Sequence, residues 1–109
     1  MKRGEVWTAA GGADYATKPR PIVIVQDDRF ESGDSITICP LTTDPTLGPL
    51  VRLDVAPTEA SGLRAASRLM VDKLTTIPRD KLGRRVGRLD DETMLRLNRA
   101  MLVFLGMAG

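Results

Sequence analysis

The feature that most constrains the fold is a short, continuous apolar run, Ile22–Val25, directly after the residues Pro19, Arg20 and Pro21. Four apolar residues in a row predict a buried strand. The prolines fix their own φ angles and donate no backbone hydrogen bond, so the chain is stiff where it enters this strand. The sequence therefore holds a long cationic side chain, Arg20, at the edge of the predicted core.

Further short segments of alternating apolar and polar residues predict more strands. They lie at 3–10, 35–41 and 50–57, with one or two strands within 66–77 and a last strand at 84–89. Segments rich in turn-forming residues separate them: a loop at 11–19 that we expect to be mobile, a hairpin-like connection at 27–34, a loop at 42–49, a turn at 58–63 and a helical turn near 79–83. Short strands at close spacing predict a small, strongly bent antiparallel barrel or sandwich.

The C-terminal segment has the pattern of a helix. Asp90 can cap its start, and Asp91 and Glu92 suit the positive end of a helix dipole. Gly106 is a reasonable end. The expected apolar face consists of Met94, Leu97, Met101 and Phe104/Leu105, with Arg96 and Arg99 facing elsewhere. We expect this helix to pack over one end or face of the sheet, with its methionines filling the core.

Composition narrows the possible chemistry. The chain has 109 residues, which favours a single domain over 1–109, and 42% of them are hydrophobic, enough for one core. It contains no histidine and one cysteine, Cys39, which excludes Ser-His-Asp, Cys-His and two-histidine mechanisms and argues against a zinc site. A lone cysteine in a predicted strand favours a buried, inert thiol and a reducing cytoplasm. No apolar run is long enough for a membrane span.

Charge is unevenly distributed along the chain. The formal net charge is +2, but residues 27–61 carry two arginines against seven acidic residues, whereas residues 64–88 carry eight basic residues against two acidic ones. The basic stretch is compatible with a polyanion-binding face and equally with a solvated surface.

Two predicted strand ends carry polar residues that could act together. Lys18 and Arg20 precede the buried strand, and Thr42 and Thr43 follow the strand at 35–41. A planar guanidinium beside a hydroxyl forms a good phosphate cradle and can stabilise developing negative charge. Arginine and threonine are also common at strand ends in solvated or capping roles, so both interpretations stay open on these residues alone.

Five collinear segments give the chain a family resemblance. "RGEVW", "KPRPIVIVQDD", "PLTTD", "SGLRAASRLMVDKLTTIPRDKLG" and "VGRLDDETMLRLNRAML" occur in the order and spacing of the MazF/PemK-like toxins, the mRNA interferases of bacterial toxin–antitoxin systems. The resemblance extends from Lys2 to about Leu105. It implies a mainly β fold, an SH3-like small barrel with a C-terminal α-helix.

The resemblance also implies an activity. Members of this family are homodimeric endoribonucleases that cut single-stranded RNA at short motifs without a metal or other cofactor. The ribose 2′-OH attacks the adjacent phosphate and leaves a 2′,3′-cyclic phosphate and a 5′-OH end. The catalytic arginine of the family falls on Arg20 and its catalytic threonine on Thr42. We expect RNA contacts from Lys18, Thr43, Ser67, Arg68 and Lys73.

The resemblance further implies a cognate antitoxin with a flexible, acidic and apolar tail, for which the basic stretch 64–88 and the loop 11–19 are the expected surfaces. Pro19 precedes the arginine where many members have a basic residue or histidine. Lys73 follows Asp72 where a glutamine is common, and Asp27-Asp28 replace a common asparagine. These departures leave the RNA motif open. The general base is also unassigned, because arginine is effectively always protonated.

Two other functions remain compatible with the sequence. One is a non-enzymatic toxin similar to the CcdB poisons of DNA gyrase, and the other is a catalytically inactive nucleic-acid-binding barrel. The Arg20 and Thr42 motifs favour the ribonuclease, since a gyrase poison does not need that pair.

Overall fold

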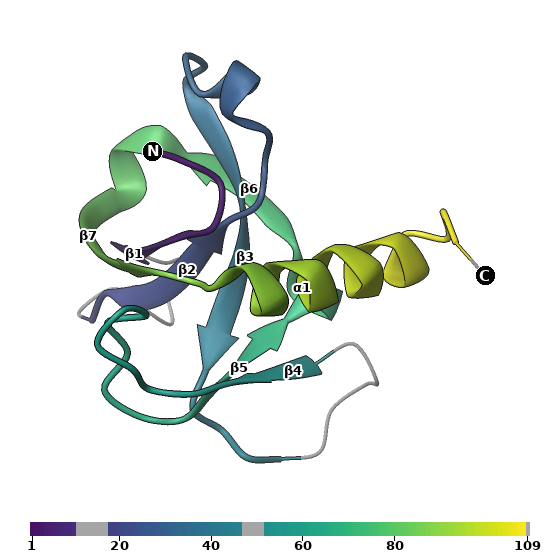
Figure 1. Cartoon of the computed structure of the whole chain (residues 1–109). Coiled ribbons are helices and arrows are strands. Elements are labelled where there is room, and N and C mark those ends of the chain that lie inside the picture. The colour runs from purple at the N-terminus through teal and green to yellow at the C-terminus, as the bar shows by residue number, and fades with distance from the viewer. Residues whose placement is uncertain (11–17, 47–51, 109) are drawn as a thin grey trace.

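The computed structural model describes residues 1–10, 18–46 and 52–108, and its core is one curved antiparallel sheet (Figure 1). The strands are β1 (Glu5–Ala9), β2 (Arg20–Ile24), β3 (Ser35–Thr42), β4 (Arg52–Val55), β5 (Ser67–Met70), β6 (Thr75–Pro78) and β7 (Leu82–Arg88). Their order in the sheet is β4-β5-β3-β2-β1-β7, and β6 pairs with β3 outside this path. The prediction of a mainly β fold with a C-terminal helix is confirmed.

The bend of the sheet comes from β3, the longest strand described. One edge of β3 pairs with β2, while its other edge pairs first with β6 and then, at Leu41 and Thr42, with β5. The long strand β3 therefore belongs to two parts of the sheet, one with β6 and one with β5 and β4, as Figure 1 shows.

The strand β2 is buried on both faces, which explains its uninterrupted apolar sequence. Val23 belongs to one core cluster, which also contains Leu97 of the helix. Ile22 and Ile24 belong to a second cluster, which includes Ile36 and Ile38 of β3. The sheet therefore separates two small cores, and the start of β2 lies at the rim of the second.

Several connections differ from the sequence-based expectation in detail. The predicted 27–34 connection contains a 3-10 helix, Asp28–Phe30. The segment 66–77 holds two strands joined by a 3-10 helix, Val71–Lys73. The helical turn expected near 79–83 is a 3-10 helix at Arg79–Lys81. Residues 11–17 of the predicted mobile loop, and 47–51, lie outside the described residues.

The helix α1 (Asp91–Phe104) begins as predicted. The Asp90 carboxylate accepts a hydrogen bond from the Thr93 amide at 2.7 Å, and Gly106 ends the helix with a φ of 74°. Leu97 is fully buried, and α1 lies against β4 and the 3-10 helix Val71–Lys73. No helix among the described residues is long and apolar enough to cross a bilayer.

The helix packs against the sheet as expected, but the predicted apolar face is not buried at its C-terminal end. Phe104 is 44% exposed and Leu105 is 57% exposed. The reason is geometric: the last turns of α1 extend past the edge of the sheet, so no strand lies beneath them (Figure 1).

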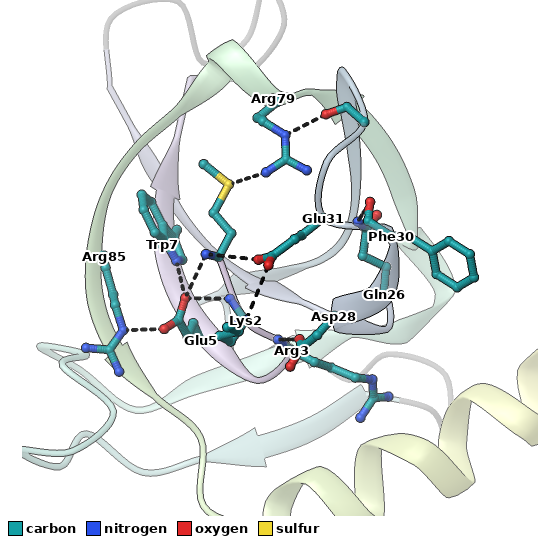
Figure 2. A network of polar contacts seen from close by, with 12 residues as sticks. Lys2, Arg3, Glu5, Trp7, Gln26, Asp28, Phe30, Glu31, Arg79 and Arg85 are labelled. Carbon is teal, nitrogen blue, oxygen red and sulfur yellow. Dashed lines mark hydrogen bonds and ion pairs between the residues drawn. The ribbon is translucent and has the colours of Figure 1, made fainter.

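A polar network fixes the N-terminal segment beside the sheet (Figure 2). Arg3 donates to the Val25 carbonyl at 2.7 Å and to the Asn98 side chain at 2.6 Å, which ties β2 to α1. Glu5 pairs with Arg85 of β7, with 2.9 Å between Oε2 and Nε. These contacts hold β1 between β2 and β7.

Candidate active site

The two predicted catalytic residues lie at the ends of neighbouring strands. The last pair in the β2–β3 register joins Ile22 and Pro40. Continuing that register by two residues places Arg20, the first residue of β2, opposite Thr42, the last residue of β3. Residues two apart in a strand point to the same face, so Arg20 and Thr42 share the face of Ile22 and Pro40.

Both side chains line one hollow with a volume of about 230 Å³. Its floor is apolar and comes from the second core cluster, through Ile22, Ile38 and Ile77. Arg20 is exposed, while Thr42 is half-buried. The site thus combines a guanidinium and a hydroxyl at the rim of an apolar recess.

The hydroxyl of Thr42 makes one hydrogen bond within the described residues. Its Oγ1 accepts a hydrogen bond from the Asp44 amide at 3.1 Å. Because a hydroxyl has one donor and two acceptor positions, this bond leaves the hydroxyl hydrogen available to a ligand in the hollow. The Asp44 carboxylate accepts from the hydroxyl and the amide of Thr46, and these bonds lower the pKa of Asp44.

Lys73 lines the same hollow as Arg20 and Thr42. It ends the 3-10 helix Val71–Lys73, which is anchored by the residue before it. Asp72 accepts two hydrogen bonds from Arg52 of β4, at 3.1 and 3.2 Å, and this pair lowers the pKa of Asp72. The bidentate contact fixes the backbone from which Lys73 extends.

A second hollow, of about 400 Å³, lies on the other side of Arg20. Arg20 lines both hollows, and Lys18, Thr43 and Ser67 line the second but not the first. Thr43 follows the end of β3 and lies away from the recess that holds Thr42, as the alternation of a strand predicts.

The remaining two predicted contacts are already engaged by the protein. Ser67 is 4% exposed and donates to the Ala65 carbonyl at 3.0 Å. Arg68 donates to the Thr46 carbonyl at 3.0 Å, and its Nε lies 3.3 Å from a carboxylate oxygen of Asp54 without hydrogen-bond geometry. Both line a third hollow that adjoins the second through Thr43.

Two residues at the second hollow escaped the sequence analysis, namely Arg64 and Arg84. The positive charge of residues 64–88 marked the segment but could not distinguish the arginines that face the hollow from those that pair elsewhere. Cys39 is fully buried, as expected, and burial raises the pKa of its thiol to about 12.

Comparison with known proteins identifies the family. Residues 2–105 match the PemK-like, MazF-like toxins of type II toxin–antitoxin systems. This chain belongs to that family. It is 52% identical over 109 residues to a protein of Mycolicibacterium smegmatis named a probable endoribonuclease MazF, and the match covers 100% of both chains.

Solved structures of MazF toxins share the fold. The chain superposes with a TM-score of 0.80 on a mycobacterial endoribonuclease solved with its cognate antitoxin, at 24% identity, covering 100% of this chain and 98% of that one. The Mycobacterium tuberculosis toxin MazF-mt6 gives the same TM-score and identity, covering 96% of this chain and 99% of that one. A MazF of Deinococcus radiodurans solved with MazE has a TM-score of 0.78 at 10% identity, with 99% and 97% coverage.

Proposed function

We propose that this chain is a toxin of a type II toxin–antitoxin system and acts as an endoribonuclease on single-stranded RNA, with Arg20 and Thr42 as its catalytic residues. The observation that carries the site assignment is their placement opposite each other on one face of β2 and β3, lining one hollow. The enzymatic activity rests on family membership and on the relative named a probable endoribonuclease.

The proposed chemistry is an internal transesterification. The ribose 2′-oxygen forms a bond to the adjacent phosphorus, the bond from phosphorus to the 5′-oxygen breaks, and a proton passes from the 2′-OH to solvent while the leaving oxygen gains one. The products are a 2′,3′-cyclic phosphate and a 5′-OH end. Negative charge grows on the phosphoryl oxygens, where the guanidinium of Arg20 and the free hydroxyl hydrogen of Thr42 can both donate.

The first hollow provides a place for a base next to the scissile phosphate. Its apolar floor suits the face of a nucleobase, which only an unstacked single strand can offer. Lys73 at its rim supplies a cation for a phosphate or for an acceptor on the base edge. Lys18, Thr43, Ser67 and Arg68 extend the proposed RNA surface across the other two hollows.

Inhibition by a cognate antitoxin follows from the same assignment. Among the similar solved structures are an endoribonuclease in complex with its cognate antitoxin and a complex of MazE with MazF. We propose that an acidic, partly apolar tail covers the basic stretch 64–88 of this chain and blocks the RNA surface. A tail that orders on binding needs an extensive contact to offset its lost entropy.

We also propose that the whole chain, residues 1–109, works as one domain, in the cytoplasm and as a homodimer. Exposed apolar side chains are concentrated on the last turns of α1 and just after it, a pattern that marks association surfaces. They are Leu102, Val103, Phe104, Leu105 and Met107. Sedimentation equilibrium is expected to give twice the mass of one chain, and Val103→Glu is expected to give monomers.

The test of the activity is incubation of the purified protein with single-stranded RNA in excess EDTA. We expect cleavage at a short motif, with fragments that carry a 2′,3′-cyclic phosphate and a 5′-OH. Intact RNA together with arrested DNA gyrase would instead establish the CcdB-like alternative. RNA that is bound but never cut would identify an inactive binding barrel.

A further inference from the structure

The second hollow is strongly basic. Four cationic side chains line it, namely Lys18 just before β2, Arg20 at the start of β2, Arg64 in the loop before β5, and Arg84 of β7. No aspartate or glutamate is among the described residues around this hollow. Cations from three separate parts of the chain therefore face the same space, and the described residues place no carboxylate among them.

Two arginines of the hollow, Arg64 and Arg84, differ from most other arginines of the described chain. Arg52 pairs with Asp72, Arg85 with Glu5, and Arg29 with Asp27. Arg64, Arg84 and Lys18 have no side-chain hydrogen bond or ion pair within the described residues.

The neighbours Arg84 and Arg85 show the contrast within one strand. Arg85 reaches Glu5, while the side chain of Arg84 lines the hollow (Figure 2 shows Arg85).

The loop that leads to Arg64 is held by a set of hydrogen bonds. The buried Ser61 hydroxyl accepts from the amides of Thr58 and Leu63, and the Arg88 amide donates to the Ala60 carbonyl at 2.8 Å. These bonds fix both the loop itself and its position on β7.

Two glycines allow this close approach of loop and strand. A side chain at Gly62, which has a φ of 72°, would collide with the Val86 carbonyl. A side chain at Gly87 would collide with the Ser61 carbonyl. The backbone thus holds Arg64 and Arg84 on fixed supports on the two sides of one hollow.

We propose that Arg64 and Arg84 form, with Lys18, a second phosphate subsite that binds the RNA phosphodiester next to the scissile one. This inference rests on the proposed function, because it places the scissile phosphate at Arg20, which lines both hollows. A strand whose cut phosphate lies at Arg20 extends its next phosphate into the second hollow. Cations that extend from a well-supported backbone, with no carboxylate among the described residues of the hollow, suit a backbone phosphate, which every RNA sequence offers.

The test measures binding of an uncleavable RNA. A short oligonucleotide with 2′-deoxyribose at the mapped cut site is titrated with wild-type protein, Arg64→Gln, Arg84→Gln and the double variant by fluorescence anisotropy. Arg99→Gln is the matched control, since Arg99 is exposed on α1 and lines none of the three hollows. Thermal melts establish that all variants are folded.

We expect each single variant to bind roughly fivefold more weakly and the double variant at least roughly tenfold more weakly, with Arg99→Gln unchanged. Log affinity decreases as log salt increases. In the double variant this decrease should be shallower, with the magnitude of the slope smaller by about 0.7, the value for one phosphate contact on a single strand. A methylphosphonate scan then locates the contact. One linkage beside the cut should weaken binding to the wild type when it is neutralised, and should have no effect on the double variant.

The proposal is overturned if the double variant binds RNA like Arg99→Gln, or if every methylphosphonate affects the wild type and the double variant equally. It is also overturned if the double variant loses affinity only for an acidic antitoxin peptide, because the hollow then serves that partner. If the wild type cuts no RNA, the methylphosphonate scan covers every linkage. One linkage that weakens binding to the wild type and not to the double variant would then support the subsite, while the proposed activity fails.

Discussion

Ser61 and Ser67 provide a matched test of how the proposed RNA surface is supported. Both side chains are 4% exposed, so truncation to alanine removes the same atoms from equally buried positions. They differ in their hydrogen bonds. Ser61 accepts from the Thr58 amide at 3.0 Å and the Leu63 amide at 3.3 Å and donates to a carbonyl at 3.2 Å, whereas Ser67 makes one donated bond, to Ala65.

Ser61→Ala therefore leaves two amides and one carbonyl without their partner, while Ser67→Ala leaves one carbonyl. With a net value of about 1 kcal/mol for each bond, Ser61→Ala should cost about 2–3 kcal/mol and Ser67→Ala about 1 kcal/mol. For a chain of this length these costs correspond to decreases in melting temperature of about 10 °C and about 4 °C.

Differential scanning calorimetry and urea unfolding of the two variants measure this difference. The urea slope should stay unchanged, because neither variant alters the surface exposed on unfolding. RNA affinity should fall for Ser61→Ala even well below its melting temperature, since the loop that holds Arg64 loses its support. Equal decreases in melting temperature for the two serines would refute the hydrogen-bond reasoning.

Two further predictions concern the core and the pH dependence of stability. Leu97→Ala should lower the free energy of unfolding by about 2–5 kcal/mol because Leu97 is fully buried. Leu95→Ala should lower it by less than about 1 kcal/mol, because Leu95 is 57% exposed on the same helix. Equal losses in urea unfolding would refute the assigned helix face. The hydrogen bonds from Arg52 lower the pKa of Asp72 below its ordinary value of 3.8. The stability that this carboxylate contributes is therefore present above pH 3.8 and is lost as the pH falls through the lower pKa of the folded state. Asp72→Asn should flatten the acid limb of a plot of melting temperature against pH, and an unchanged acid limb would show that the pair contributes nothing there.

The parts of the fold that the sequence predicted are those set by local pattern. The run Ile22–Val25 predicted the buried strand, and Asp90 and Gly106 marked the two ends of α1, because capping and strand burial depend on residues close in sequence. The exposure of Phe104 was not predictable in this way. The spacing of Phe104 from the other apolar residues of α1 is that of a buried face. Whether a strand lies beneath this residue depends on where the sheet ends, which the spacing does not show.

The candidate site was predicted only in part for the same reason. Strand order implied that Arg20 and Thr42 would meet, since their strands are consecutive along the chain. The roles proposed for Arg64 and Arg84 depend on a loop packed against β7 through Gly62 and Gly87, which no local pattern indicates. The Arg52–Asp72 pair joins residues 20 positions apart, so local sequence patterns could not predict it either.

The most direct test of the central claim is single-turnover cleavage of a short RNA in EDTA by the wild type, Arg20→Ala, Thr42→Ala and the double variant. If the two side chains act on one developing charge, each single variant should be about 100- to 1,000-fold slower, and the double variant should be slower by much less than the product of the two effects. Melting temperatures of the variants should stay close to that of the wild type, because both residues lie at strand ends. Near-wild-type rates for folded Arg20→Ala or Thr42→Ala would contradict the assignment of the active site.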